Sequence, residues 1–252
     1  MTILPPSAVE AFKRNGWVIT DLLDGHVSRE LARWVSDIAT WENDGPWLQY
    51  HEMTELGPKI CRTENFTPYH SGLDQLLRFG PLITAASDLL GEPAVLYKEK
   101  INYKLAGGAG FAAHQDAPAY RFVNVHISCM IAVDPATVEN GCLEIASAKH
   151  DRIYPMNDAG CIQEAIADTF DWMPVQLSPG QVLWFDSRTP HRSGPNNSND
   201  DRRALFPTYN ALREGDLRAR YYDQKAEEFR QMRDSGTTVR VSLIGDFQGR
   251  PV

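Results

Sequence analysis

The chain has 252 residues, of which 42% are hydrophobic and 23% are charged. This composition suits a globular protein with a sizeable core and excludes a disordered or low-complexity chain. The formal net charge of −8 argues against nucleic acid or an anionic membrane as the main partner, because both need a basic surface. A local basic pocket could still hold an anion.

The length is that of one domain, and no linker, composition break or repeat divides residues 1–252. Residues 1–8 carry neither a basic start nor an apolar run, and no stretch approaches a membrane span. The four cysteines form no Cys-x-x-Cys pair and are expected to be buried apolar residues. We therefore expect a cytoplasmic protein whose partner is a small molecule. The oligomeric state stays open.

Residues 1–93 are expected to be mostly helical. An amphipathic helix is predicted to follow Pro5 and Pro6 and to end at Gly16, before a short strand at 17–19. Residues 28–41 and 73–90 place apolar side chains at helical spacing, and the second of these segments is interrupted near Gly80 and Pro81.

Residues 94–245 are expected to form the β core. Alternation, apolar runs and Gly/Pro turns predict strands at 95–105, 122–133, 141–146, 202–212 and 237–243, a hairpin of 175–177 with 181–186, and a helix at 216–230. Helices followed by many antiparallel strands predict a mainly β fold, a sandwich or jelly roll with a helical layer packed on one sheet.

A candidate metal site begins at His114 and Asp116, which follow a glycine-rich turn. Residues i and i+2 of an extended segment point to the same side, so an imidazole and a carboxylate lie together. His191 follows Pro190 much later in the chain. Two histidines and one carboxylate on one face of a metal are typical of Fe(II) oxygenases. The alternative is chance, because the chain has seven histidines and a lone histidine is more often an ordinary surface residue.

An arginine pair lies downstream of the second histidine. Arg202 is eleven residues after His191 and opens a predicted strand, with Arg203 beside it. A dicarboxylate co-substrate that chelates iron at one end needs a cation at its other end, and arginine provides one that is always charged. Either arginine fits, and the other one is then a solvated residue at the start of the strand.

Two predicted strands carry polar side chains on one face. On the strand at 122–133, these side chains are Asn124, His126 and Ser128, followed by Met130, and they alternate with apolar ones. On the strand at 95–105, they are Lys98, Lys100, Asn102 and Lys104. If the apolar faces meet the helices, the polar faces line an internal pocket. The alternative is that both polar faces meet solvent.

These features resemble the phytanoyl-CoA dioxygenase family of Fe(II)/2-oxoglutarate oxygenases. The resemblance rests on KINYK (100–104), GF (110–111), HQD (114–116), ENGCL (139–143), SAKH (147–150), PG (179–180) and PHRSGP (190–195), with Arg202. It implies a double-stranded β-helix, a cupin-like jelly roll, which agrees with the strand pattern. It also implies Fe(II), 2-oxoglutarate and O2 as the metal and co-substrates.

The resemblance assigns roles to individual residues. It makes His114, Asp116 and His191 the iron ligands. It makes Arg202 the partner of the far carboxylate of 2-oxoglutarate, with Ser193 and Asn102 as further contacts. It implies oxidative decarboxylation of 2-oxoglutarate to succinate and CO2, coupled to hydroxylation. Related halogenases lack the carboxylate ligand, so Asp116 favours hydroxylation.

A narrower resemblance concerns the substrate. RTENF (62–66), KEKINYKL (98–105), HQDAPAY (114–120), RALFPTYN (203–210) and GDLR (215–218) resemble bacterial hydroxylases of 2-aminoethylphosphonate and its N-trimethyl analogue. We therefore expect hydroxylation of an aliphatic carbon of a small zwitterionic phosphonate, in phosphonate catabolism.

Candidate substrate residues follow from the chemistry of that zwitterion. Phosphonate needs cations and donors, and an amine suits aromatic rings and carboxylates. The resemblance adds Lys100 and Phe111 as cavity positions. The candidates are Lys100, Lys104, Phe111, Tyr120, Asn124, His126, Arg62 and Tyr209, with Trp184 and Glu64 also considered.

Two other functions stay open. The first is hydroxylation of a different small metabolite, such as an amino acid, a compatible solute or a natural-product intermediate. The second is a jelly-roll protein that binds a metal without catalysis. Arg202 at its distance from His191 speaks against the second.

Overall fold

Two antiparallel sheets form the centre of the molecule, seen in a computed structural model that describes residues 2–42, 45–120, 122–236 and 247–249. The larger sheet has the strand order β1-β9-β6-β11-β4-β3-β2, and the smaller one β5-β10-β7-β8. Apolar side chains of β6, β9 and β11 pack against those of β7 and β8 between the sheets. This is the jelly-roll architecture that the strand pattern predicts.

The strands have short, well-defined bounds. The larger sheet contains Trp17–Thr20 (β1), Leu48–Thr54 (β2), Gly57–Glu64 (β3), Ala94–Lys104 (β4), His126–Ala132 (β6), Val182–Asp186 (β9) and Arg202–Ala211 (β11). The smaller sheet contains Phe111–His114 (β5), Leu143–Ala146 (β7), Trp172–Val175 (β8) and His191–Ser193 (β10).

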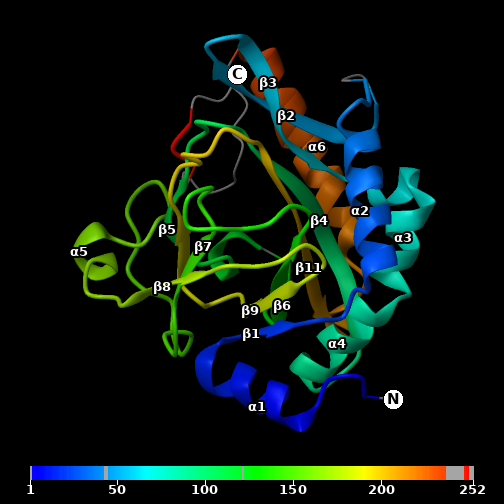
Figure 1. The fold of residues 1–252 in the computed structure, drawn as a ribbon, viewed down its shortest axis with the longest axis vertical. Helices are drawn as coiled ribbons and strands as arrows, with labels where there is room; N and C mark the ends of the chain where they lie inside the picture. Colours follow the sequence, from blue (N-terminus) through cyan, green and yellow to red (C-terminus); the bar gives the residue numbers. More distant parts are fainter. Residues whose placement is uncertain (1, 43–44, 121, 237–246, 250–252) are drawn as a thin grey trace.

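The helices lie mainly against the larger sheet. They are Pro6–Asn15 (α1), Gly25–Ile38 (α2), Ser71–Arg78 (α3), Pro81–Leu90 (α4), Glu164–Ala167 (α5) and Arg218–Asp234 (α6). The apolar side chains of α1, α2, α3 and α4 share one core with the outward side chains of β4, β6, β9 and β11. In Figure 1, α2, α3 and α4 lie along one side of the molecule and α6 lies beside β2 and β3. The predicted helical layer is confirmed.

The N-terminal part is not purely helical. The strands β2 and β3 form a hairpin that adds to the edge of the larger sheet through β4, while β1 pairs with β9 at the other edge. The hairpin is missing from the prediction because a register shift between Tyr50 and His51 interrupts the alternation of β2. The boundary at residue 93 therefore does not separate a helical part from a β part.

A β-bulge sets the orientation of β4. Thr208 of β11 is opposite Lys98, whereas the next residue, Tyr209, is opposite Leu96, so Tyr97 is an extra residue in β4. Leu96 therefore belongs to the core under the helices, while Lys98 and the even-numbered residues after it face the smaller sheet. The shared polar face predicted for this strand is an inward face.

Two other predicted elements differ from the structure. Residues 175–177 and 181–186 do not form a hairpin, because β8 pairs with β7 in one sheet and β9 pairs with β1 and β6 in the other. The strand predicted from 122 starts at His126. The last predicted strand, at 237–243, lies outside the described residues.

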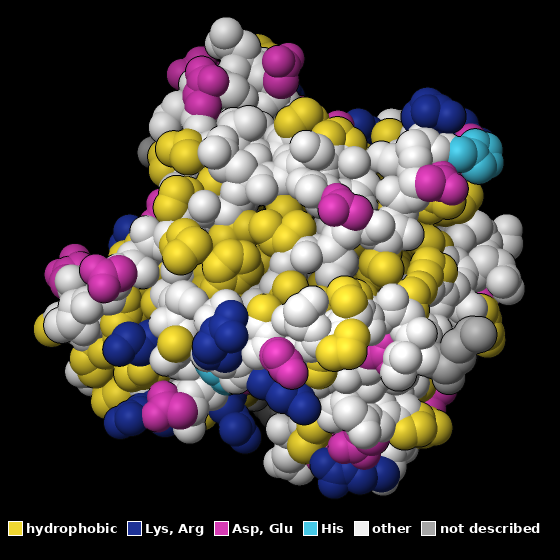
Figure 2. Space-filling view, turned by 60° about the horizontal axis from the view of Figure 1, so that its bottom comes forward, with side chains coloured by type: hydrophobic (Ala, Val, Ile, Leu, Met, Phe, Trp, Pro, Cys, Tyr) yellow, Lys and Arg dark blue, Asp and Glu magenta, His cyan; other side chains and the backbone are white. Residues whose placement is uncertain are grey.

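The surface carries charges of both signs. On the face shown in Figure 2, Lys and Arg lie among Asp and Glu, around side chains that are hydrophobic. Among the described residues, no helix is both long enough and apolar enough to cross a membrane.

Candidate active site

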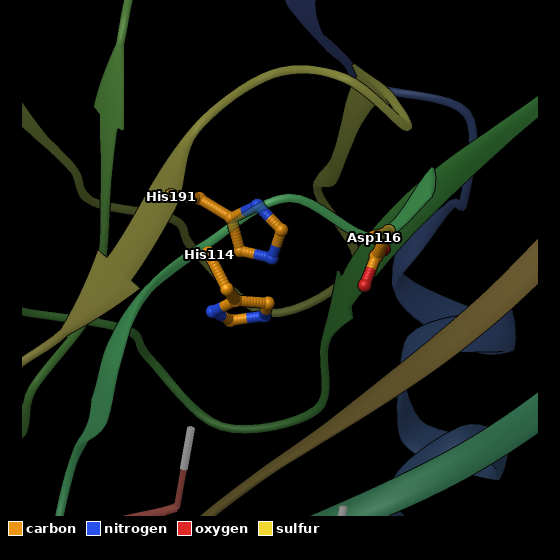
Figure 3. A group of neighbouring side chains, drawn as sticks. All are labelled: His114, Asp116 and His191. Carbon is orange, nitrogen blue, oxygen red and sulfur yellow. The ribbon is translucent and has the colours of Figure 1, made fainter. Parts of the chain in front are cut away.

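Three buried side chains meet between the sheets. His114 ends β5, Asp116 follows it, and His191 opens β10, which pairs with β5 directly at His114. One potential ligand atom from each lies within 4.8 Å of the others. Figure 3 shows the two imidazole rings side by side with the carboxylate facing them. The residues that the sequence analysis combined therefore do lie together.

Both imidazoles are oriented by backbone carbonyls. The Nδ1 atom of His114 lies 2.8 Å from the Ala112 carbonyl oxygen, and Nδ1 of His191 lies 3.0 Å from that of Thr189. A carbonyl only accepts, so each Nδ1 carries the proton, and Nε2 is the ring nitrogen that carries none and that can bind a metal. Burial, with a smaller effect of His114, lowers the pKa of His191 to about 4, so this ring is neutral at physiological pH.

Asp116 is held as a carboxylate. Its Oδ2 accepts a hydrogen bond of 2.7 Å from the Ser128 hydroxyl, and that hydroxyl lies 3.1 Å from Oγ1 of Thr208. Burial alone raises the pKa of Asp116, but His191 and then Lys100 outweigh burial and hold this pKa well below its usual range. Two imidazoles and one carboxylate form the ligand set of a divalent iron site, so the residues fit that metal.

A cationic end of the cavity lies next to the triad. Arg202 is 4% exposed, and its Nε and Nη2 donate to the carbonyls of Asn140 and Gly141. Its Nη1 is buried and has no partner among the described residues. Lys104 donates to the Ser193 hydroxyl over 2.9 Å. These three side chains line the same cavity as the triad, so they fit the far carboxylate of 2-oxoglutarate.

The charge of Arg202 affects the pKa of Lys104. Burial, and then the charge of Arg202, lower the pKa of Lys104 to about 7. Burial lowers the pKa of Arg202 to about 10. Both pKa values are lowered because the two cations are buried in a site with little water. Such a site favours the binding of an anion. Lys104 therefore lies at the co-substrate end, although the sequence analysis placed it with the substrate.

Arg203 points the other way. Its guanidinium forms an ion pair with Asp134 over 2.7 Å and donates to the Ser36 hydroxyl on α2. Successive residues of a strand face opposite sides, so Arg202 faces the cavity and Arg203 faces the helices. The ambiguity between the two arginines is resolved in favour of Arg202 lining the cavity.

Four other expected residues lie at the cavity or directly behind it. Lys100, Asn102 and Phe111 line it. Arg62 donates to the side-chain oxygen of Asn102 over 2.9 Å and lies 5.7 Å from the ring of Phe111, so it supports both. Arg62 is itself 3% exposed and forms a 3.7 Å ion pair with Glu64.

Tyr120 and His126 lie on the other side of Asp116. Tyr120 lines the cavity, and burial, with the charge of Asp116, raises the pKa of its hydroxyl well above the usual value. Tyr120 therefore keeps its proton and is a hydrogen-bond donor. His126 lies behind Tyr120, with ring centroids 5.0 Å apart, and both its nitrogens are buried without partners among the described residues.

Two expected substrate residues are not at the site. Asn124 is exposed, precedes β6, and is bonded to Glu214. Tyr209 faces the helices, because it is on the opposite side of β11 from Thr208, and its hydroxyl donates to the Leu77 carbonyl. Trp184, which packs near Tyr209, donates to Thr20 and belongs to the same core. These assignments are corrected by the side of the strand that each residue occupies.

The cavity also contains residues that the sequence analysis did not select. Phe206 and Thr208 line it from β11, on the side predicted by the alternation with Arg202. Glu52 lines it from β2, and burial raises the pKa of its carboxyl. The alternation in β11 could have identified the first two, but Glu52 depends on the missed hairpin.

Comparison with known proteins agrees with this site. The family model described as Phytanoyl-CoA dioxygenase (PhyH) matches residues 78–204. A methylphosphonate hydroxylase of Gimesia maris is 44% identical over 99% of this chain and 98% of its own length. A 2-aminoethylphosphonate dioxygenase from an uncultured bacterium is 39% identical over 86% of each chain.

A solved structure has the same fold. The protein EctD of S. alaskensis, crystallised with 2-oxoglutarate and 5-hydroxyectoine, superposes with a TM-score of 0.71 at 20% identity. The match covers 84% of this chain and 77% of that one. The family match, the long relatives and the shared fold agree, and the chain belongs to the phytanoyl-CoA dioxygenase family as an Fe(II)/2-oxoglutarate-dependent dioxygenase.

Proposed function

We propose that this enzyme hydroxylates an aliphatic carbon of a small organophosphonate, and that its 252 residues work as one catalytic domain. Methylphosphonate and 2-aminoethylphosphonate are the substrates to test first, because they are named for the two relatives above. The N-trimethyl analogue of the second compound belongs to the same class.

An excess of buried positive charge carries the proposal. Glu64 is 1% exposed and faces three cations, Arg62, Lys98 and Lys225, which are each less than 10% exposed. Lys100 lines the cavity opposite Glu64 in the sheet. Burying several charges of the same sign close together is costly. A phosphonate carries between about one and two negative charges near pH 7 and would balance this region.

The roles of the residues follow from their positions. His114, Asp116 and His191 would hold Fe(II), which supplies O2 activation coupled to decarboxylation of 2-oxoglutarate. Arg202, Lys104 and Ser193 would bind the far carboxylate of 2-oxoglutarate, and Asn102 would orient the same molecule from β4. The phosphonate would then lie near Lys100, with Phe111 and Tyr120 excluding water around it.

The test is a succinate-release assay with Fe(II), 2-oxoglutarate and ascorbate. The compounds are methylphosphonate, 2-aminoethylphosphonate, its N-trimethyl analogue, and a panel of amino acids and betaines. We expect release above the substrate-free rate with at least one phosphonate, and a hydroxylated phosphonate detected by phosphorus NMR. Release with an amino acid or betaine and with no phosphonate would favour the other class of hydroxylase.

The control for the iron site is a pair of histidine variants. His114→Ala should lose turnover and bound Fe(II) while keeping its circular dichroism spectrum, because the ring is a ligand and not part of the apolar core. His26→Ala, on the exposed start of α2, should behave as wild type. Turnover by His114→Ala would disprove the assignment of the ligands.

A further inference from the structure

Lys98 has an unusual position for a lysine. It is 5% exposed and follows the β-bulge of β4, so that its side chain points to the inward face of the sheet. Long charged side chains are almost never buried without a partner. Among the described residues, Lys98 nevertheless has no hydrogen bond and no ion pair, and its ammonium lies 4.3 Å from the ring centroid of Tyr120.

The surroundings of Lys98 lead to the metal site. Lys98 is directly opposite Thr208, which in turn is opposite Ser128, and Ser128 holds Asp116. Tyr120, over which the ammonium lies, forms part of the cavity wall. The ammonium is therefore on the Asp116 side of the cavity, whereas Arg202 and Lys104 occupy the co-substrate end.

The charge of Lys98 is poorly balanced without a guest. Burial, and then repulsion by Lys100, lower the pKa of Lys98 well below its usual value. Asp116 and Glu64 act in the opposite direction. However, Asp116 would share its charge with iron, and Glu64 already pairs with Lys225 over 2.5 Å. An anion between Lys98 and Lys100 would stabilise both ammonium groups.

We infer that Lys98, with Lys100, binds the phosphonate group and makes the site select a doubly charged phosphonate over a carboxylate or a phosphonate monoester. This inference rests on the proposed function. Lys98 is then a specificity-determining residue, because its ammonium binds the second negative charge of the substrate. Tyr120 holds the ammonium in place through its ring and keeps a proton for donation.

The test measures substrate binding with and without the Lys98 charge. Lys98→Met keeps the length of the side chain and removes the ammonium. Charge-assisted hydrogen bonds contribute enough that Kd and KM for the phosphonate should rise by roughly 10- to 100-fold. Kd comes from calorimetry under nitrogen with Fe(II) and 2-oxoglutarate bound, so that it does not depend on turnover. Affinity for 2-oxoglutarate, which binds at the other end of the cavity, should stay within about twofold of wild type.

Selectivity separates recognition from a structural role. In wild type, methylphosphonate should bind much more tightly than acetate or the monomethyl ester of methylphosphonate, and Lys98→Met should lose most of this preference. Lys98→Arg, which keeps the charge, should retain part of it. Lys59→Met removes an exposed lysine of the neighbouring strand β3 and should change neither binding nor preference.

Each outcome decides the question. Unchanged phosphonate affinity in Lys98→Met, or an equal loss of 2-oxoglutarate affinity, would overturn the inference. If that variant does not fold, the comparison in wild type decides, since equal binding of methylphosphonate and its monoester would also overturn the inference. Absence of phosphonate turnover in wild type, with tight phosphonate binding that depends on Lys98, would reject the proposed reaction and keep the anion site.

Discussion

At the scale of single residues, each function depends on the side of a strand that a side chain occupies. Arg202 and Arg203 are adjacent and chemically identical, yet one lines the cavity and the other pairs with Asp134 beneath α2. Sequence analysis identified the pair through the chemistry of a dicarboxylate. The choice between them depends on which face of β11 each arginine occupies. Thr208 and Tyr209 differ in the same way, since Thr208 lines the cavity and Tyr209 belongs to the core under the helices.

The arginines give opposite predictions. Arg202→Ala should raise the Kd for 2-oxoglutarate by roughly 10- to 100-fold, because a charge-assisted contact in a buried site is lost. Arg203→Ala should leave that Kd unchanged and lower the melting temperature, because its ion pair and its bond to Ser36 join β11 to α2. Calorimetric titration of 2-oxoglutarate and thermal melts measure the two effects. A weaker Kd only in Arg203→Ala would reverse the assignment.

Tyr209 tests the boundary between core and cavity. Tyr209→Phe removes the hydroxyl that donates to the Leu77 carbonyl over 3.0 Å and keeps the ring. We expect a loss of about 1–2 kcal/mol in the free energy of unfolding, because a buried acceptor loses its donor. KM for the substrate should stay the same. Denaturant unfolding measures the free energy of unfolding, and steady-state kinetics measure KM. A change confined to KM would show that Tyr209 contributes to the cavity and not to the core.

At the scale of elements, periodicity predicted an element where it has enough residues and no register shift, and missed the hairpin of β2 and β3. The helix α1 and the strand β11 agree with the sequence pattern because each has enough residues to show its period. The strands β5 and β10 have four and three residues and show no period. His114 and His191 on these strands were found through their chemistry, since the triad needs particular donors and not a particular strand length.

A glycine pair tests the loop that closes the co-substrate end. Gly141 has φ +70°, and a Cβ there would lie 2.5 Å from the Gly194 carbonyl oxygen and 2.7 Å from Nζ of Lys104. Gly107 has the same φ but nothing within 4 Å. Gly141→Ala should weaken 2-oxoglutarate binding, whereas Gly107→Ala should only cost about 1 kcal/mol of stability from backbone strain. Equal effects in both variants would show that strain alone matters.

At the scale of the whole molecule, an acidic protein encloses a basic cavity. The net charge of −8 argued against nucleic acid or an anionic membrane as the main partner and left room for a local basic pocket. On the face in Figure 2, cationic and anionic side chains are interspersed. Composition could not reveal that Arg62, Lys98 and Lys225 are buried together, because that depends on the missed hairpin and on the packing of α6.

The cavity should make co-substrate binding depend on pH. The pKa of Lys104 is about 7, so its ammonium is mostly charged below that value and mostly neutral above it. Binding of 2-oxoglutarate needs the charged form, and affinity should therefore fall as the pH rises from about 6 to about 8. Calorimetry over this range measures the effect. Lys104→Met should bind weakly at every pH with a flatter profile, and an equally steep profile in that variant would assign the titration elsewhere.

The bulge at Tyr97 has a consequence for how this protein can change over generations. From Lys100 onward, the even-numbered residues of β4 line the cavity, and Ile101 belongs to the core under the helices. Substitutions at 98 or 100 can thus change the substrate specificity during evolution without disturbing the core under the helices. Deletion of Tyr97 would remove the bulge and keep both sets on their present faces, because Leu96 and Lys98 would then be neighbouring residues opposite Tyr209 and Thr208.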